Sequence, residues 1–516
     1  MSGFLKVSFF GSRWCLLTMV LLVFQYDSVL SKITRGSSNS KVTEVQLLNR
    51  AGTEAQQNLK IFLPRGGGGK KSIKGTQEPF TPIDQVEGEM PIFTAVFNMI
   101  VDLCPSGIMP LAYGLAAGGG TGIGTAITLL VFFGSLAGYT MVSLGRVCET
   151  TKQISLSGVW ANVIGQKTAW VPDVAVSLLT FGCCVFFSAF MGDIFAALAE
   201  ALGVSGAVLK STMNNFGLRT STILMLTVFP VLPLCLLKDL SALQYTSFGG
   251  LVAILYTAFF VALRFFDGSY QDGGKFFSMM ETALQPIEST GSLFKVGPGS
   301  LIFLNIVCVG FLVHYNSLNY YTGLQKRSVA TMKKVVSLGM GTAFLVFLVM
   351  MTFGFRTFGL SAQPLLLNNY HKTADVPASW ARLAVGVSIL CGYPLMFMAC
   401  KTSLHSSIET CASNLQLKPH VKDTLSISVL LIITAIACNC GQDDVGFVIG
   451  IVGSLLGAFA CYIMPSLLNI KLFNADKLDL SGKELLFNKV LLALGVMFAI
   501  FGTAVTCLER FTDILG

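Results

Sequence analysis

The most unusual chemical group in this sequence is a carboxylate inside a long apolar run. Asp102 lies within the segment 92–117, which is otherwise almost entirely apolar. An ionisable side chain inside a membrane-length apolar segment is costly and by default indicates a functional site. Asp102 could bind a cation, take up a proton or pair with an amine. The competing interpretation is a protonated acid that only makes a hydrogen bond between helices.

Two prolines and a glycine follow this acid. Pro105, Gly107 and Pro110 lie within six residues, near the middle of the same segment. Each proline removes a backbone donor and clashes with the preceding helical turn. Unwound backbone at membrane depth is tolerated only against protein or water. Its free carbonyl groups can bind an ammonium group, and the helix N-terminus beside it can bind a carboxylate. The alternative is a simple kink, but the combination with Asp102 favours a binding site.

A second polar interruption occurs in the apolar segment 299–323. His314, Tyr315, Asn316 and Ser317 are consecutive there. His314 could be a gate or a proton-handling group, or a histidine satisfied by a nearby carbonyl. The two interrupted segments start about half the protein apart, which suits two repeated halves. Asp193 in a third apolar segment either faces a pathway or supports helix packing, and packing is slightly favoured.

The elements that must position these groups are membrane helices. Of 516 residues, 53% are hydrophobic and 12% charged, and a soluble domain carries roughly twice that charge. The apolar residues form solid blocks of about 20 residues, which indicates spanning helices rather than a β-barrel. The predicted spans are 92–117, 121–145, 173–202, 220–238, 244–265, 299–323, 332–356, 379–402, 424–440, 445–468 and 488–508. We therefore predict an all-α integral membrane protein with about eleven transmembrane helices.

The first 90 residues differ from the predicted membrane domain, 91–516. Lys6 and Arg13 precede the short apolar stretch Trp14–Phe24, which is typical of a signal peptide. Residues 31–75 are basic and rich in serine and glycine. They are expected to be either a flexible cytosolic tail or part of an organelle-targeting leader, and whether residues 1–30 are cleaved stays open.

The basic residues between the spans predict the orientation. If the first span starts in the cytosol, lysine and arginine are about twice as frequent in the cytosolic connections as in the opposite ones. The N-terminus is therefore expected to be cytosolic, although an uncleaved anchor at 14–24 would invert this. The net charge of +8 is explained by topology rather than by nucleic-acid binding. Plasma membrane and endomembrane (a vacuole or organelle) remain alternatives.

Motifs for catalysis or cofactors are not found. The 14 cysteines lie mostly inside apolar segments and show no C-x-x-C spacing, so free apolar cysteines are favoured over metal ligands. The glycine cluster 118–124 follows no strand and is interpreted as a tight turn. We expect no metal and no cofactor, and an enzyme is not predicted, because no catalytic cluster is visible at a membrane face.

Several segments together resemble one family, the amino acid/auxin permeases, over residues 90–508. The first span resembles its "FN…G-x-GIL-x-LPYA" helix. Further matches are Gly138–Arg146, Gly192–Phe195, Pro233–Leu240 followed by Leu243–Ser247, His314–Asn316, Ala381–Val385 and Tyr393–Leu395. Each motif alone is weak, but their order and spacing make the match fairly specific. The resemblance implies a LeuT-like fold of two inverted five-helix repeats plus one extra helix.

The resemblance also implies where a substrate would bind. An amino acid would meet the backbone of the first helix, with residues of the sixth helix opposite. By motif position these substrate-binding residues are Cys104, Pro105, Ser106, Gly107, Ile108, Val309, Gly310 and His314. The chain departs from the family at Val101, where asparagine is usual, and at Asp102 and Pro105, where glycine or alanine is usual. Leu390 and Gly392 occupy two expected sodium-ligand positions.

These observations lead to one main prediction and its rivals. We expect a secondary active transporter that moves amino acids, more specifically neutral ones, across a membrane by alternating access. Because two sodium positions are apolar, proton coupling through Asp102 is favoured over sodium coupling. The rivals are a sensor with a transporter fold that signals to a cytosolic partner, and a polytopic membrane enzyme. The expected partners are the amino acid and membrane lipid, and the oligomeric state is left open.

Overall fold

A computed structural model describes residues 88–204, 217–236, 246–288, 292–411 and 416–511. The predicted leader and tail, 1–90, lie outside the described residues apart from the last three. The described chain is almost entirely helical, and two isolated bridges join described residues, Met90 with Leu324 and Ile287 with Gly359. The all-α prediction is confirmed.

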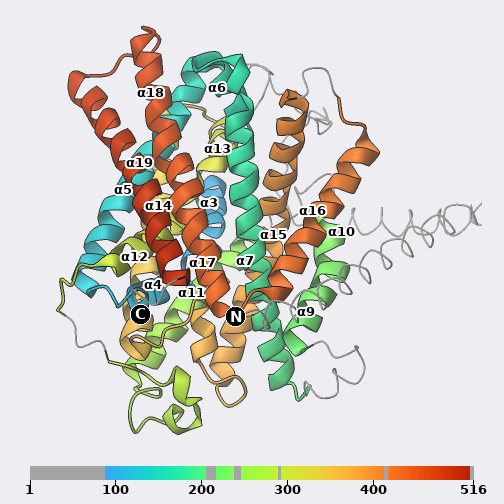
Figure 1. The fold of residues 1–516 in the computed structure, drawn as a ribbon, viewed down its shortest axis with the longest axis vertical. Coiled ribbons are helices and arrows are strands. Elements are labelled where there is room, and N and C mark those ends of the chain that lie inside the picture. Colours follow the sequence, from blue (N-terminus) through green and yellow to red (C-terminus); the bar gives the residue numbers. More distant parts are fainter. Residues whose placement is uncertain (1–87, 205–216, 237–245, 289–291, 412–415, 512–516) are drawn as a thin grey trace, which may run out of the picture. The chain divides into compact units, whose positions relative to one another are not determined.

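Ten helical segments of the described chain are long and apolar enough to cross a bilayer, and a shorter apolar helix precedes them. Figure 1 shows them as a bundle. The first half comprises α3 (Ile92–Gly107) with α4 (Leu111–Ala116), α5 (Ile123–Thr151), α7 (Trp170–Ala201), α9 (Leu218–Leu226) with η3 (Thr227–Val231) and α10 (Leu232–Leu236), and α11 (Thr246–Phe266). The short helix α6 (Leu156–Val163) connects α5 to α7.

The second half repeats this order. It comprises α12 (Pro298–Gly310) with α13 (Ser317–Gly323), α14 (Val329–Phe358), α15 (Val376–Cys411), α16 (Pro419–Asn439), and α17 (Gln442–Ile451) joined through η9 (Val452–Gly457) and η10 (Phe459–Ile463) to α18 (Met464–Asn474). The additional helix α19 (Gly482–Phe511) follows. About eleven spans are therefore confirmed.

The boundaries differ most in the eighth span. The sequence predicts 379–402, but α15 is 36 residues long and extends from Val376 to Cys411. The polar residues Lys401, Thr402 and Ser403 lie where the apolar run stops. They end the apolar run without ending the helix, because a helix that has left the hydrocarbon layer still satisfies its own backbone.

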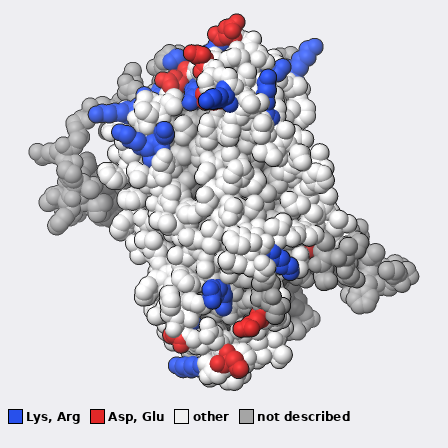
Figure 2. All heavy atoms as spheres, turned by 90° about the vertical axis from the view of Figure 1, so that its left-hand side faces the viewer, with Lys and Arg blue, Asp and Glu red and all other residues white. Residues whose placement is uncertain are grey.

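Charged side chains gather towards the two ends of the helices. Figure 2 shows a broad uncharged belt between them on one face. At one end the start of α3 pairs with the end of α13 through Met90 and Leu324, and Arg146 of α5 forms a 2.6 Å ion pair with Glu484 of α19. We call this the basic end, because its connections carry Lys152, Lys326, Arg327, Lys333, Lys334, Lys418, Lys422, Lys477 and Lys483. The opposite end is called the loop end.

At the loop end, an ion pair and a hydrogen bond join the end of α11 and the connection after it to the residue that precedes α15. Arg264, near the end of α11, contacts the fully buried Asp375 through Nη2 and Oδ1 (2.6 Å) and through Nε and Oδ2 (2.9 Å). Tyr270 donates a further hydrogen bond of 2.9 Å to Asp375. Burial and the neighbouring Asp375 carboxylate raise the pKa of Tyr270, so its phenol remains protonated and able to donate.

Candidate functional site

The first interruption lies later in the chain than the sequence predicts. We expected unwound backbone around Pro105, Gly107 and Pro110, but α3 remains helical through Gly107 and only Ile108–Pro110 are irregular. Pro105 is accommodated because it removes one hydrogen bond without forcing the next residues out of helical geometry. Ile108 donates its N–H to the Cys104 carbonyl at 2.9 Å. The carbonyl of Cys104 is therefore already engaged.

The two prolines instead leave two other main-chain carbonyls without their usual hydrogen-bond donor. Because Pro105 and Pro110 have no N–H, the carbonyls of Val101 and Ser106 cannot receive the usual helical hydrogen bond from four residues ahead. These two main-chain oxygens of the first span therefore lack their usual helical donor.

The second interruption follows the predicted position closely. Helix α12 ends at Gly310, residues Phe311–Val313 are irregular, and a 3₁₀ turn at His314–Asn316 leads into α13. The predicted break within 299–323 is therefore present.

The two interrupted helices cross at a pair of glycines. A Cβ atom added to Gly107 would lie 3.0 Å from the Gly310 Cα and 2.4 Å from Cζ of Phe347 on α14. Only a residue without a side chain lets the two backbones come this close. The helix ends at Gly107 and Gly310 consequently face one another, with Phe347 packed over them.

The remaining predicted substrate residues of the two helices are buried wherever their side chains are described. Cys104 and Ile108 are buried, at 0% and 1% exposure, and Pro105 is also buried. Ser106 is part of α3, but its side chain lies outside the described set. The Val309 side chain faces Gly453 of η9, because a Cβ atom on Gly453 would lie 3.0 Å from its Cγ2. Val309 could therefore contribute its backbone rather than its side chain.

His314 points away from the first helix. Its Nε2 lies 3.0 Å from the Thr140 hydroxyl and 3.1 Å from the Ala137 carbonyl, both on α5. Its Nδ1 lies 3.1 Å from Cys461 Sγ on η10. Both ring nitrogens are thus engaged in the interior, and the expectation that His314 faces Cys104–Ile108 does not match this geometry. Sequence spacing could not reveal the direction of this ring.

Asp102 connects the two interrupted helices. Its Oδ1 accepts a 2.7 Å hydrogen bond from the Tyr315 hydroxyl. Its Oδ2 lies 3.3 Å from the Tyr320 hydroxyl and 3.4 Å from the Asn316 amide nitrogen. Asp102, Tyr315 and Asn316 are all partly exposed. We call these four residues the Asp102 cluster; it joins α3 to the segment that follows the second break.

One candidate residue was not identified from the sequence. Ser388 on α15 is 4% exposed, and its hydroxyl has no hydrogen-bond partner among the described residues. A Cβ atom on Gly250 would lie 3.5 Å from Ser388 Oγ and 3.1 Å from Val101 Cγ1, so these three residues meet. The signal that could have found Ser388 is its position six residues before Pro394, on the same helix face as the lining residue Cys391.

Asp193 takes part in packing, as the sequence slightly favoured. Its Oδ1 lies 2.5 Å from Nε of Arg219 on α9, and Arg219 also donates to the Ala437 carbonyl on α16 at 3.2 Å. Through Arg219, the Asp193 pair therefore links α7, α9 and α16 near the loop end.

Two solved structures have a similar overall fold. The chain aligns with the structure of MhsT in complex with L-phenylalanine at a TM-score of 0.53 and 14% identity, covering 83% of this chain and 100% of that one. It aligns with Mhp1, a nucleobase-cation-symport-1 family transporter, at a TM-score of 0.51 and 10% identity, covering 82% of this chain and 92% of that one. These likenesses support the LeuT-like fold.

Two curated relatives extend over most of the chain. "Vacuolar amino acid transporter 5" of Schizosaccharomyces pombe is 24% identical over 430 residues, which cover 83% of this chain and 95% of the relative. "Sodium-coupled neutral amino acid transporter 7" of Mus musculus is 25% identical over 404 residues, which cover 75% of this chain and 80% of the relative.

A family model described as "Transmembrane amino acid transporter protein" matches residues 89–508. This range contains both interrupted helices, the Asp102 cluster and all the predicted spans. The match agrees with the membrane fold and with the resemblance found in the sequence, and the chain belongs to this family of multi-pass membrane amino acid transporters.

Proposed function

We propose that the chain is a secondary active transporter of neutral amino acids that works by alternating access. The observation that carries this proposal is the crossing of the two interrupted helices at Gly107 and Gly310. Both α3 and α12 end there, and a helix C-terminus carries partial negative charge on its free carbonyl groups. Two such helix ends that meet at one point favour the binding of a positively charged ammonium group of the substrate. The N–H groups of the irregular segments are suited to its carboxylate.

Neutral substrates fit the side chains around this crossing. Residues 104–110 and 309–313 contain no charged side chain, so a second charge on the substrate would have no partner there. Placing an unpaired charge in such surroundings is unfavourable. The mouse relative bears the name of a neutral amino acid transporter, which supports the same assignment.

Proton coupling would use Asp102. In its charged form the carboxylate accepts hydrogen bonds from Tyr315, Asn316 and Tyr320. A protonated carboxyl group has less capacity to accept, so taking up a proton would loosen the connection between α3 and α13 at the basic end. Releasing the proton would restore it. Proton movement and helix movement are linked in this way.

Sodium coupling is a second candidate, and Ser388 is the observation that favours it. Its unpartnered hydroxyl lies near Val101, whose carbonyl has lost its helical donor. Oxygen atoms of this kind are the ligands that hard cations take from proteins. The two apolar positions predicted from the sequence are Leu390 and Gly392, whereas this hydroxyl lies two residues before Leu390 on the same helix.

Purified protein in liposomes would test the function and separate the two ions. A panel of labelled amino acids would be offered with either a pH gradient or a sodium gradient imposed. We expect concentrative uptake of neutral amino acids driven by the pH gradient. Uptake driven by sodium alone and lost in Ser388→Ala would select the second candidate. Binding without any uptake under either gradient would contradict transport and favour a sensor.

The orientation follows the charge distribution. We infer that the basic end faces the cytosol, because lysine and arginine are retained on that side during insertion. The described chain begins at this end, where Met90 pairs with Leu324. The yeast relative is named for a vacuole, and an endomembrane location is consistent with this orientation.

A further inference from the structure

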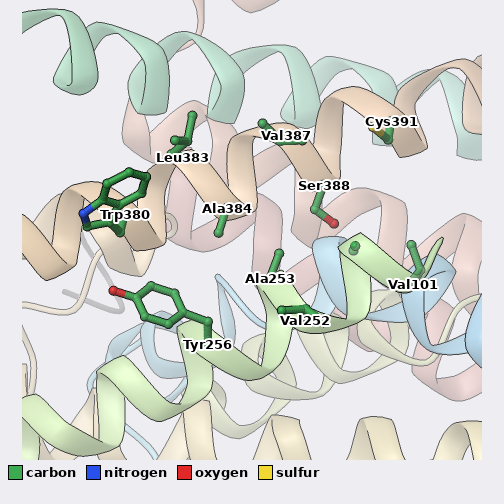
Figure 3. A pocket seen from close by; sticks show the side chains of 12 residues that line it. Val101, Val252, Ala253, Tyr256, Trp380, Leu383, Ala384, Val387, Ser388 and Cys391 are labelled. Carbon is green, nitrogen blue, oxygen red and sulfur yellow. The ribbon is translucent and has the colours of Figure 1, made fainter. Parts of the chain in front are cut away.

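A trough between α11 and α15 lies outside the crossing described above. Its volume is about 770 Å³, within the range of roughly 300–1,000 Å³ that holds small organic ligands. Figure 3 shows Tyr256 and Trp380 near one end and Val101 and Cys391 near the other. Helices α11 and α15 run antiparallel here, since the Tyr256 hydroxyl donates to the Pro377 carbonyl at 3.1 Å, whereas the earlier residue Gly250 lies beside the later residue Ser388.

Small residues on both helices create this space. Gly249 and Ala253 are one turn apart on α11, and Ala384 faces the trough from α15. A Cβ atom added to Gly249 would meet nothing within 4 Å. Helices with larger residues at these positions would fill the gap between them. The trough is therefore specified by the sequence and is not a packing defect at a single residue.

The trough opens towards the surface of the spanning region. Its rim residues Trp380, Val252 and Val387 are 60%, 51% and 46% exposed. Both helices cross the membrane, so the medium outside this rim is hydrocarbon rather than water. None of the lining residues is charged, and the Tyr256 hydroxyl is already engaged with Pro377.

We propose that this trough binds one acyl chain of a phospholipid from the leaflet nearer the loop end. On α15 the trough extends from Trp380 to Cys391, which is about 16 Å at 1.5 Å per residue. One leaflet contributes half of a hydrocarbon core about 30 Å thick, so a single chain matches its length. Trp380 lies close to the loop-end start of α15, where tryptophan typically marks the headgroup level.

The chemistry of the lining selects this occupant over the transported substrate. An amino acid would bring an ammonium and a carboxylate into a lining without charged partners, which is strongly unfavourable. Hydrocarbon needs no such partner. Ser388 lies at the inner part of the trough, but it is only 4% exposed, so the apolar residues around it form the surface that the chain would meet up to Cys391. The chain would therefore run from Trp380 past Ala384 and Val387.

Photocrosslinking in the full-length protein tests this placement. Liposomes would contain phosphatidylcholine that carries a diazirine either next to the ester or at the chain end. We expect the ester-proximal label to react near Trp380 and the chain-end label near Ala384 and Val387. Adducts in both cases should exceed those on Leu338 and Leu345 of α14, which are 52% and 61% exposed and lie on an ordinary lipid-facing surface.

A matched pair of variants provides the control. Gly249→Phe should lower the number of adducts in the trough about tenfold. A tenfold loss of affinity corresponds to the loss of about two buried methylene groups of the acyl chain. Gly341→Phe should leave them unchanged, because Gly341 is an exposed glycine of α14 whose added Cβ atom would also meet nothing within 4 Å. Wild-type adducts no more frequent than those on α14, or independent of the label position, would overturn the proposal. So would labelling of the trough by a diazirine amino acid in its place.

Discussion

The Tyr315 hydroxyl donates a 2.7 Å hydrogen bond to Oδ1 of Asp102, and this contact joins the two interrupted helices on the basic-end side of their crossing. Tyr315 belongs to the 3₁₀ turn that follows the second break, whereas Asp102 belongs to the continuous part of α3. A change in the charge of one side chain can therefore alter how the two helices are held together.

The first prediction concerns this carboxylate. Asp102→Asn should abolish amino acid accumulation driven by a pH gradient, because an amide can still take part in the hydrogen bonds but cannot take up and release a proton. Substrate binding should persist, since the crossing at Gly107 and Gly310 is not altered. Uptake in liposomes and equilibrium binding of the same labelled amino acid would be measured in parallel.

Asp173→Asn is the matched control for that experiment. Asp173 is also a buried acid on a spanning helix, and it accepts a 2.5 Å hydrogen bond from Ser406. It lies near the start of α7, outside the Asp102 cluster, so its variant should retain pH-driven uptake. If Asp102→Asn accumulates substrate as well as the wild type does, this residue is not the coupling site.

The second prediction concerns the close approach of the two backbones. Gly107→Ala should lower stability by about 1–3 kcal/mol, the usual cost of overpacking a filled interior, because its Cβ atom would lie 2.4 Å from Phe347 Cζ. Uptake should fall as well. Thermal unfolding in detergent and uptake in liposomes would measure the two effects.

Two further variants make that result specific. Gly107→Ala combined with Phe347→Leu should recover part of the stability, since the shorter side chain removes the clash. Gly341→Ala should be neutral or stabilising by up to about 1 kcal/mol, because alanine is favoured over glycine inside a helix. Wild-type stability in the single Gly107→Ala variant would show that the crossing is looser than described.

The third prediction concerns the ion pair between Arg264 and Asp375 at the loop end. Arg264→Ala should destabilise the protein by about 3–5 kcal/mol, because it leaves the fully buried Asp375 without its positive partner. Arg510→Ala is the comparison, since its ion pair with Asp444 is 40% and 35% exposed and such pairs contribute about 0–1 kcal/mol. Thermal unfolding of both variants gives the difference. Equal shifts would contradict the structural importance of the Arg264 contact.

The fourth prediction concerns orientation. Cys411 is an exposed cysteine at the basic end of α15. In sealed vesicles with their cytosolic face inside, a membrane-impermeant maleimide should label it only after permeabilisation. The signal is taken as the difference between the wild type and Cys411→Ser, which removes labelling at other cysteines from the result. Equal labelling of this residue before and after permeabilisation would place the basic end outside.

The number and order of the spans could be predicted from the sequence, because an apolar run long enough to cross a bilayer is a signal that needs no knowledge of packing. Both interruptions were also predictable in outline. Pro105, Gly107 and Pro110 disturb any helix locally, and polar residues from His314 onwards break the apolar pattern. The sequence could also single out Asp102, since an acid in such a run is unusual wherever its partners lie.

The side-chain geometry could not be predicted in this way. The break in α3 begins only at Ile108, because a helix tolerates the single hydrogen bond lost at Pro105. The direction of His314 depends on α5 and η10, which are far from it in the chain. Ser388 is one hydroxyl among many until its neighbours Val101 and Gly250 are placed beside it. Each of these features depends on contacts between distant segments.

The tenth span contains two wide turns, η9 and η10, separated only by Ala458. A π-turn contains one more residue than an α-turn. This span therefore contains more residues than an α-helix with the same number of turns. Removing one residue between 452 and 463 can be absorbed when a wide turn tightens to α-geometry. The same deletion in α15 would rotate every later side chain by about 100°. The tenth span is therefore one place where this membrane domain can tolerate a change in chain length and still keep its other helices in register.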